Sequence, residues 1–299
     1  MEGWEKLRST FVQEDTGEDK ATPVEGKLIA IISPKGGVGK TFLAVNLAVL
    51  YARQEGRVAL LDLDLTAGDV ALHLDLREGP TIVELLPYLR QGTSTALPRF
   101  TVRYGKGLEV LPAPARPELA DVVSPNEVAT LLDIVPRTYP LAFIDTPSNT
   151  SDEILLEVLE RAHQFVLVLT QDIAALRRAK MFLHVLHQLG LDPVRKVLPV
   201  LNMTSRQSPA NPNQVASFLG FKEIVVLDAD RPLVDRALFN GQPLVEMAEN
   251  SPLARQIQEV ARRLTPKSPS ALSEGTPGLG RFPWSRWFKT SRKAPQGLG

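Results

Sequence analysis

The feature that most constrains the fold of this chain is an apolar run that leads straight into a glycine-rich loop. Residues 27–33 read KLIAIIS, and the loop at residues 35–41 reads KGGVGKT, with two lysines around its glycines. Because glycine has no Cβ, the backbone amides of this loop can approach phosphate oxygens closely, and a helix that starts at Lys40 adds the positive end of its dipole. The segment therefore predicts a strand, a phosphate-binding loop and a helix, in that order.

The last two residues of the loop have the chemistry of a nucleotide site. Lys40 is placed to reach the β- and γ-phosphates of ATP, and the hydroxyl of Thr41 is placed to bind Mg²⁺. The general pattern G-x-x-x-x-G-K-[ST] would begin with a glycine at position 34, where this chain has Pro34. The loop is therefore a variant of the phosphate loop. The alternative is a glycine-rich turn whose two lysines are solvated.

Apolar runs alternate with helical patterns along most of the chain. The runs cover residues 27–33, 57–64, 107–112, 141–147, 164–170, 195–202 and 223–228, and the helical patterns cover residues 40–54, 81–90, 124–138, 151–161, 172–189, 211–219, 231–239 and 251–264. Near-continuous Val, Ile and Leu runs suit parallel strands buried on both faces. The alternation predicts an α/β fold, a doubly wound, mostly parallel sheet with helices on both faces. Ligands of such sheets bind beyond the carboxyl ends of the strands.

Three aspartates stand at the carboxyl ends of predicted strands. Asp62 and Asp64 are two residues apart and lie on one face if their strand persists, and Asp145 follows another apolar run. The three carboxylates would then face the phosphate loop. The alternative for any one of them is a helix cap or a solvated strand end, which accounts less well for all three together.

The sequence KGGVGKT resembles the deviant Walker A motif of the MinD/ParA superfamily, whose members are P-loop NTPases. The resemblance implies binding of ATP and Mg²⁺ and a homodimer with ATP sandwiched between its subunits. It also implies that Lys40 serves its own nucleotide, whereas Lys35 reaches across the dimer to the phosphates of the partner. The nucleotide contacts that it implies come from Lys35, Gly36, Gly37, Val38, Gly39, Lys40, Thr41, Phe42, Asn202 and Asp230.

The same resemblance implies roles for the chemically active residues. Those that would act on the phosphates are Lys35, Lys40 and Asp64, and those that would hold Mg²⁺ are Thr41, Asp62 and Asp145. Within the first group, Asp64 would position the attacking water. Asn202 matches the asparagine that reads the adenine edge, and Asp230 matches an acid of the following base-side loop. Turn chemistry is the alternative for both residues.

The similarity runs from about residue 28 to residue 264 and most resembles the CpaE/TadZ group, ATPases that position and help assemble type IVb (Tad/Flp) pili. The stretches that carry it are residues 62–76, 141–180 and 225–264. The resemblance implies slow, dimer-dependent hydrolysis of ATP and a membrane-associated assembly as the partner. The alternatives are a ParA-like ATPase that partitions DNA, a MinD-like regulator of division or flagellar placement, and an ATP-binding scaffold with little hydrolysis.

Two positions depart from the family pattern. Phe42 stands where a Thr or Ser often follows the Walker threonine, which removes a hydroxyl contact to the α-phosphate. After Asp145 the family often has a glycine whose amide meets the γ-phosphate, and this chain has Pro147, Ser148 and Asn149 instead. The second departure concerns the switching step rather than the binding of ATP.

Charge and composition set the ends of the chain apart from its middle. The whole chain has 34 basic and 34 acidic side chains, but residues 1–27 hold seven acids and four bases, and residues 265–299 hold one acid and six bases. We expect an acidic, disordered arm at residues 1–27, the ATPase domain at residues 28–264, a flexible linker at residues 265–280 and a basic, aromatic tail at residues 281–299.

The tail bears on the choice of partner. Residues 281–293, RFPWSRWFKTSRK, can form an amphipathic helix on an anionic membrane surface, and a disordered tail or a partner-binding peptide is the alternative. Without the +5 of the tail, residues 1–264 have a net charge of −5, a weak argument against DNA as a partner. The chain has no cysteine and no apolar run as long as a membrane span. We expect a cytoplasmic protein, peripheral at the inner face of the membrane.

Overall fold

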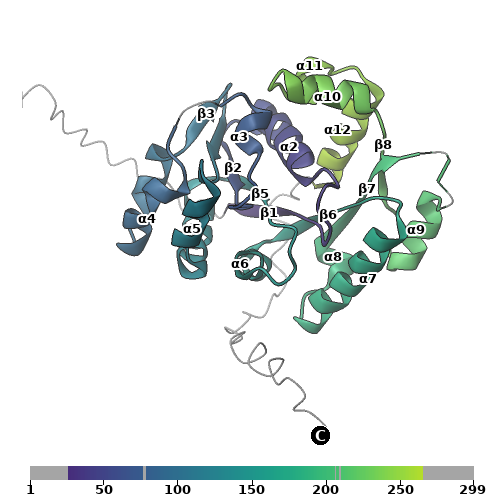
Figure 1. Ribbon diagram of the computed structural model, residues 1–299, viewed down its shortest axis with the longest axis horizontal. Coiled ribbons are helices and arrows are strands. Elements are labelled where there is room, and N and C mark those ends of the chain that lie inside the picture. The colour runs from purple at the N-terminus through teal and green to yellow at the C-terminus, as the bar shows by residue number, and fades with distance from the viewer. Residues whose placement is uncertain (1–25, 77–78, 206, 209, 265–299) are drawn as a thin grey trace, which may run out of the picture. The chain divides into compact units, whose positions relative to one another are not determined.

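The computed structural model describes residues 26–76, 79–205, 207–208 and 210–264, which build one eight-stranded sheet (Figure 1). The strands lie in the order β3-β4-β2-β5-β1-β6-β7-β8. Every neighbouring pair is parallel except β3 and β4. The strands are β1 (Lys27–Ile32), β2 (Val58–Asp62), β3 (Val102–Tyr104), β4 (Leu108–Leu111), β5 (Leu141–Asp145), β6 (Gln164–Leu169), β7 (Val197–Thr204) and β8 (Val225–Asp228).

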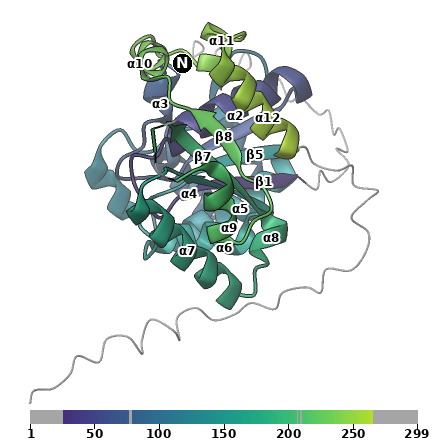
Figure 2. The same cartoon turned by 90° about the vertical axis from the view of Figure 1, so that its right-hand side faces the viewer.

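Helices cover both faces of the sheet (Figures 1 and 2). One face carries α4 (Ile82–Arg90), α5 (Pro125–Thr138), α6 (Glu153–Arg161), α7 (Ile173–Gln188) and α9 (Pro212–Leu219). The other face carries α2 (Lys40–Glu55), α3 (Val70–His73), α10 (Arg231–Phe239), α11 (Leu244–Met247) and α12 (Pro252–Leu264). The prediction of a doubly wound, mostly parallel sheet with helices on both faces is confirmed.

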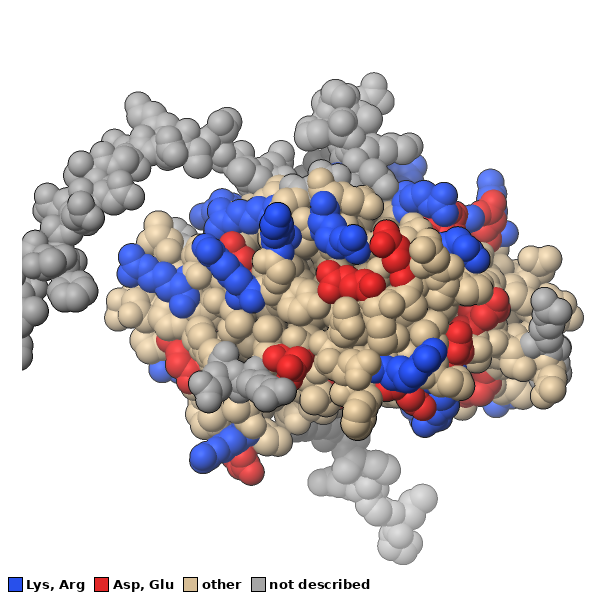
Figure 3. Space-filling view, turned by 90° about the horizontal axis from the view of Figure 1, so that it is seen from above, with Lys and Arg blue, Asp and Glu red and all other residues tan. Residues whose placement is uncertain are grey.

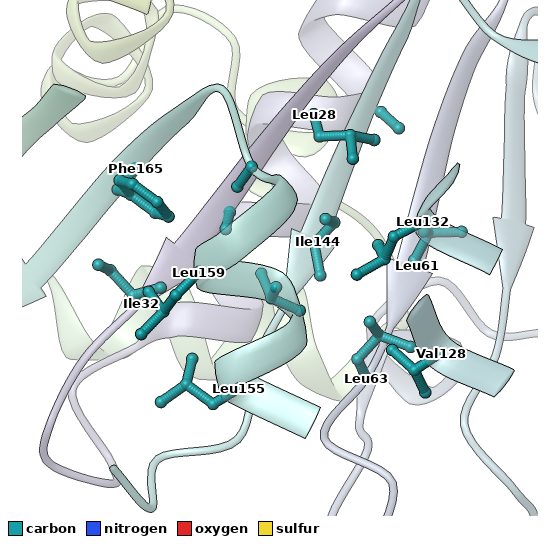
Figure 4. Close-up of a cluster of buried hydrophobic side chains, with 14 of the residues drawn as sticks. Leu28, Ile32, Leu61, Leu63, Val128, Leu132, Ile144, Leu155, Leu159 and Phe165 are labelled. Atoms are coloured by element: carbon teal, nitrogen blue, oxygen red, sulfur yellow. The ribbon is translucent and has the colours of Figure 1, made fainter. Parts of the chain in front are cut away.

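The central strands are apolar along nearly their whole length, and their side chains alternate between two hydrophobic clusters, one on each face of the sheet. In the first cluster, Leu28 and Ile144 of the sheet lie among side chains of α5 and α6 (Figure 4). In the second, the strands pack against α2 and α12, which both bury apolar stripes. A core on both faces fixes β1, β2 and β5, whose carboxyl ends position the site.

Local capping signals set where the helices begin. Thr81 and Ser124 each form a capping box with the glutamate three residues later, which satisfies two amides that the first turn leaves unpaired. Proline occupies the first helical position of α5 and α9, where its missing N–H breaks no bond. Because these signals are local, the predicted helix bounds agree with the structure to within two residues.

The sequence patterns missed the shortest elements. The edge strand β3 is three residues long and antiparallel to β4. Helices α3, α8 (Pro193–Lys196) and α11 each span four residues, and two 3-10 segments lie at Ser94–Arg99 and Pro117–Val122. None of these elements is long enough to show a period of two or 3.6 residues.

The predicted arm, apart from Gly26 and Lys27, and the predicted linker and tail lie outside the described residues. β1 begins at Lys27, one residue before the predicted start of the ATPase domain. Within the described ranges, no helix combines the length and the apolar character that crossing a membrane requires.

Candidate functional site

The glycine-rich loop joins β1 to α2 and has the backbone of a phosphate cradle. Gly37 and Gly39 have φ values of 72° and 90°, in the left-handed region that glycine tolerates best. A Cβ at Gly39 would lie 2.5 Å from Nδ2 of Asn202, which together with the positive φ favours glycine there, whereas Gly37 faces open space. No side chain of the described residues caps α2, so the amides of its first turn remain available to an anion.

The two loop residues with nucleotide chemistry both contact the carboxyl end of β5. Nζ of Lys40, a residue that is almost fully buried, donates to Oγ of Ser148 at 2.6 Å. Oγ1 of Thr41 donates to Oδ2 of Asp145 at 2.5 Å. The start of α2 and the end of β5 therefore meet over one small region, as the strand-end prediction requires.

Asp62 and Asp145 lie side by side because β2 pairs with β5 in the register that places them opposite each other. Both are buried, and burial together with the neighbouring carboxylate raises the pKa of Asp62 well above its usual range. Burial also raises the pKa of Asp145. Oδ1 of Asp145 has no hydrogen-bond partner within the described part of the chain. Two adjacent buried carboxylates with an unpaired oxygen make the arrangement expected of a cation site.

Magnesium suits these donors. Mg²⁺ prefers oxygen ligands and is commonly held by one or two carboxylates together with phosphates and water. Thr41, Asp62 and Asp145 supply a hydroxyl and two carboxylates within one hydrogen-bonded and strand-paired group. The residues present therefore fit the ion that the sequence predicted.

The segment after β2 folds back over Asp62. The amides of Asp64 and Val70 donate to its two carboxylate oxygens, at 3.3 and 3.1 Å. A Cβ at Gly68 would lie 2.6 Å from Oδ2 of Asp62, so the close approach requires glycine. β2 ends at Asp62, so the strand does not persist to Asp64 and the two aspartates do not share a strand face.

Asp64 nevertheless stays close to the phosphate loop. Burial raises its pKa, and the positive charge of Lys40 opposes that rise. The carboxylate of Asp152, which caps α6, adds a further upward influence on the pKa of Asp64. Asp64 is therefore an acid in the field of Lys40.

The second lysine of the loop points away from the cradle. Nζ of Lys35 donates to Oδ2 of Asp172 at 2.7 Å, and Thr170 donates to the same oxygen at 2.5 Å. Oδ1 of Asp172 accepts from the amide of Ala175 and so caps α7. Partial burial opposes the shift, but the hydrogen bonds from Lys35 and Thr170 lower the pKa of Asp172 to about 2.

Sequence reasoning missed two residues of this site. In the sequence, Ser148 stands out only as one of three residues where the family often has a glycine, and Asp172 only as the first residue of a predicted helix. A signal existed for Asp172, because an acid between the end of a buried strand and the start of a helix is an N-cap at the ligand-binding edge of the sheet. Ser148 has no comparable signal.

The remaining predicted contacts have structural partners of their own. The amide of Asn202 donates to the carbonyl of Val38 at 2.8 Å, and its oxygen accepts from the amide of Met203. Asp230 caps α10 through the amide of Leu233, as the turn-chemistry alternative requires. Phe42 is buried in the core behind α2. The adenine-side roles of Asn202 and Asp230 stay predictions.

Known proteins share this architecture. An uncharacterised ATP-binding protein of Methanocaldococcus jannaschii is 27% identical over 236 residues, which cover 79% of this chain and 86% of that protein. The ParA family ATPase from Chlorobium tepidum superposes with a TM-score of 0.72 at 21% identity, over 79% of this chain and 98% of that one. The septum site-determining protein MinD from Pyrococcus horikoshii, complexed with Mg-ADP, gives a TM-score of 0.69 at 21% identity, over 80% of this chain and 96% of that one.

The family model for the CobQ/CobB/MinD/ParA nucleotide binding domain matches residues 29–231. The matched range holds the glycine-rich loop, both buried aspartates of the cation site and the loop that carries Ser148. It covers more than half of the chain. The chain therefore belongs to the CobQ/CobB/MinD/ParA family of nucleotide-binding domains.

Proposed function

We propose that this MinD/ParA-family ATPase is an ATP-dependent, dimerising switch that positions or helps assemble a membrane-associated machine, a type IVb pilus of the CpaE/TadZ kind. The observation that supports the switch is that the two lysines of the loop contact different residues. Lys40 donates to Ser148, in the segment after β5, whereas Lys35 donates to Asp172 at the start of α7. The pilus role rests on the resemblance of residues 62–76, 141–180 and 225–264 to that group.

In the proposed hydrolysis, the phosphate loop and the cation site have different roles. The glycine amides and Lys40 would hold the phosphates in line, and Mg²⁺ would neutralise charge on the phosphate oxygens. Asp64 would orient the attacking water from the segment after β2. Turnover should be slow and should depend on the dimer, as the resemblance to the CpaE/TadZ group implies.

The ion pair between Lys35 and Asp172 is weak enough for Lys35 to exchange Asp172 for another anionic partner. The side chains are 35% and 41% exposed, and an exposed ion pair of this kind contributes at most about 1 kcal/mol. A phosphate group of a nucleotide on a second subunit carries more charge than one carboxylate and could take the lysine. Lys35 would then complete the site of the partner, as an arginine finger does.

A second candidate function, a ParA-like ATPase that binds DNA, is favoured by the distribution of charge. Residues 173–222 contain seven Lys and Arg residues and one acid, Asp192. α7 carries no acid, and Arg177, Arg178 and Lys180 are exposed on it. On the face seen from above in Figure 1, basic and acidic side chains are instead interspersed (Figure 3).

One solved structure of similar fold bears on the placement role. The Aquifex aeolicus structure of similar fold is a complex of MinC with MinD, so a protein of this architecture binds a protein partner. Placement of a division or flagellar apparatus is the MinD-like form of the proposal. Peripheral binding to the inner face of the membrane would use residues 281–293, which lie outside the described residues.

Variants of the two lysines test the proposed switch. With Mg²⁺ and ATP, light scattering should report dimerisation of the wild type. Lys40→Ala should abolish ATP binding, whereas Lys35→Ala should keep ATP binding by the monomer and lose dimerisation and turnover. Asp64→Ala should hold the ATP dimer, because it removes the water-positioning carboxylate.

Lys106→Ala is the matched control, since Lys106 is an exposed lysine at the β3–β4 turn. Dimerisation that survives Lys35→Ala would make the second lysine a solvated neighbour and would refute the switch. A wild type that dimerises with ATP but releases no phosphate would instead identify a scaffold.

A further inference from the structure

The segment between β5 and α6 places a hydroxyl inside the phosphate cradle. Oγ of Ser148 accepts from Nζ of Lys40 at 2.6 Å. A Cβ built on Gly36 would lie 3.8 Å from Oγ of Ser148 and 3.9 Å from its Cβ. The hydroxyl therefore lies beside both Lys40 and Gly36 of the loop. A phosphate oxygen that binds Lys40 would occupy the same region.

The same hydroxyl still has a proton to donate. A serine hydroxyl offers one donor and two acceptor positions. Its bond to Lys40 uses an acceptor position, and no described residue accepts its proton. A nucleotide phosphate that enters the cradle meets both the ammonium group of Lys40 and the O–H group of Ser148.

We propose that the Ser148 hydroxyl binds the γ-phosphate of ATP. This contact takes the place of the glycine amide that the family often uses, and it allows the protein to distinguish ATP from ADP. The proposal rests on the proposed ATPase function and names the residue that senses the γ-phosphate. The hydroxyl accepts a hydrogen bond from Nζ of Lys40. With ATP it would donate to a γ-phosphate oxygen, and with ADP it would keep its bond to the lysine.

The backbone around Ser148 is held firmly enough for such a contact. Two residues before it, the buried Thr146 donates its hydroxyl to the carbonyl of Ile31 at 2.7 Å, which ties the segment to β1. Pro147 restricts the backbone between them and has no N–H of its own. Four residues after Ser148, Asp152 caps α6 through the amide of Ile154 at 2.8 Å. The segment is therefore held at Thr146 and at Asp152, and Ser148 lies between these two residues.

The charges around Lys40 favour a neutral donor at this place. Asp64 and Asp145 both lie within the field of Lys40 and would repel an incoming phosphate. A second lysine in the segment could form an ion pair with those carboxylates, whereas a hydroxyl offers a proton without a charge. α6 begins five residues after Ser148, so a change in the position of Ser148 would act close to the start of that helix.

Nucleotide affinities of a Ser148→Ala variant test the proposal. Titration calorimetry with Mg²⁺ should give about tenfold weaker binding of a non-hydrolysable ATP analogue, the loss expected for one hydrogen bond to a charged oxygen. Binding of ADP should stay within about twofold of the wild type, because ADP does not use this donor. Ser148→Thr keeps the hydroxyl and should restore the preference for ATP.

Ser151→Ala is the matched control, since Ser151 is an exposed serine of the same segment. It should change neither affinity, and circular dichroism should show that all three variants are folded. Equal tightening of both nucleotides in Ser148→Ala would mean that the hydroxyl only occupies Lys40 in the empty protein. Equal weakening, or no change, would mean that it shapes the loop or does nothing. Each of these results overturns the proposal, whereas a wild type that binds neither nucleotide refutes the ATPase function itself.

Discussion

Individual residues at the carboxyl end of the sheet are placed for ligands rather than for stability. Asp62 and Asp145 are paired at the ends of the neighbouring buried strands β2 and β5. One carboxylate oxygen of Asp145 has no hydrogen-bond partner among the described residues. Burying a charged group without full compensation destabilises the folded protein. The raised pKa of each aspartate expresses that destabilisation, because the folded protein binds their protons more tightly than the unfolded chain does.

We predict that Asp145→Asn stabilises the nucleotide-free protein. The amide can still accept from Thr41 and removes one of two adjacent buried charges. The Tm should rise by a few degrees, since about 1 kcal/mol corresponds to roughly 2–4 °C in a domain of this size. Because the folded pKa of Asp145 is raised to about 6, the gain should be largest above that pH and shrink as the pH falls through it, where the wild-type carboxyl is protonated.

Thermal melts across pH measure this gain. Mg²⁺ with nucleotide should then raise the Tm of the wild type and leave that of Asp145→Asn almost unchanged. A variant that is less stable than the wild type at every pH would contradict the assignment of Asp145 to a cation site.

At the scale of elements, the helix behind the phosphate loop is tied to the helices that cover it. Asn46 of α2 is buried, donates to the carbonyl of Phe42 at 2.7 Å and accepts from the amide of Val245 in α11 at 3.0 Å. Further along α2, the hydroxyl of Tyr51 donates to the carbonyl of Ala261 in α12 at 2.7 Å. These two bonds couple α2 to elements more than 190 residues later in the chain.

We predict that Asn46→Leu destabilises the domain although it adds an apolar side chain to a core. The substitution leaves the buried amide of Val245 without an acceptor, a loss of about 1–3 kcal/mol. Urea unfolding should show this loss. Gln54→Leu, an exposed position of the same helix, should change the free energy of unfolding far less. An unchanged midpoint for Asn46→Leu would mean that α11 is held to α2 by apolar packing alone.

For the whole molecule, the balanced composition conceals an uneven distribution of charge. The chain has 34 basic and 34 acidic residues, but the stretch from α7 to the end of α9 contains far more bases than acids. Long-range attraction of an anionic partner depends on the local field and not on the net charge of the chain. The argument against DNA from the net charge of residues 1–264 is therefore weak.

The two candidate functions predict different results with DNA. If the protein is ParA-like, ATP should produce a gel shift of non-specific duplex DNA that weakens steeply with salt, and the double variant Arg177→Glu, Arg178→Glu should abolish it. The matched control is Arg99→Glu with Arg103→Glu, exposed arginines beside and on the edge strand β3. If the protein serves a pilus machine, the wild type should give no shift even at low salt.

The local elements of this protein are encoded in short stretches of its sequence. The apolar runs predicted seven of the eight strands, and capping residues such as Thr81 and Ser124 placed the helix starts, because both signals lie within a few neighbouring residues. The loop KGGVGKT likewise predicted a phosphate cradle, since its backbone chemistry depends on its own glycines. The edge strand β3 escaped because it is too short to show a period.

The side chains that meet in the site are brought together by the arrangement of the strands in the sheet. The order and register of the strands bring Asp145 beside Asp62, Ser148 onto Lys40 across 108 residues, and Asp172 onto Lys35 across 137 residues. Such partners have no local signature, because strands that neighbour each other in the sheet are far apart in the chain. The position of Asp64 also has no local signature. β2 ends before Asp64, and the amides of Asp64 and Val70 donate to the carboxylate of Asp62.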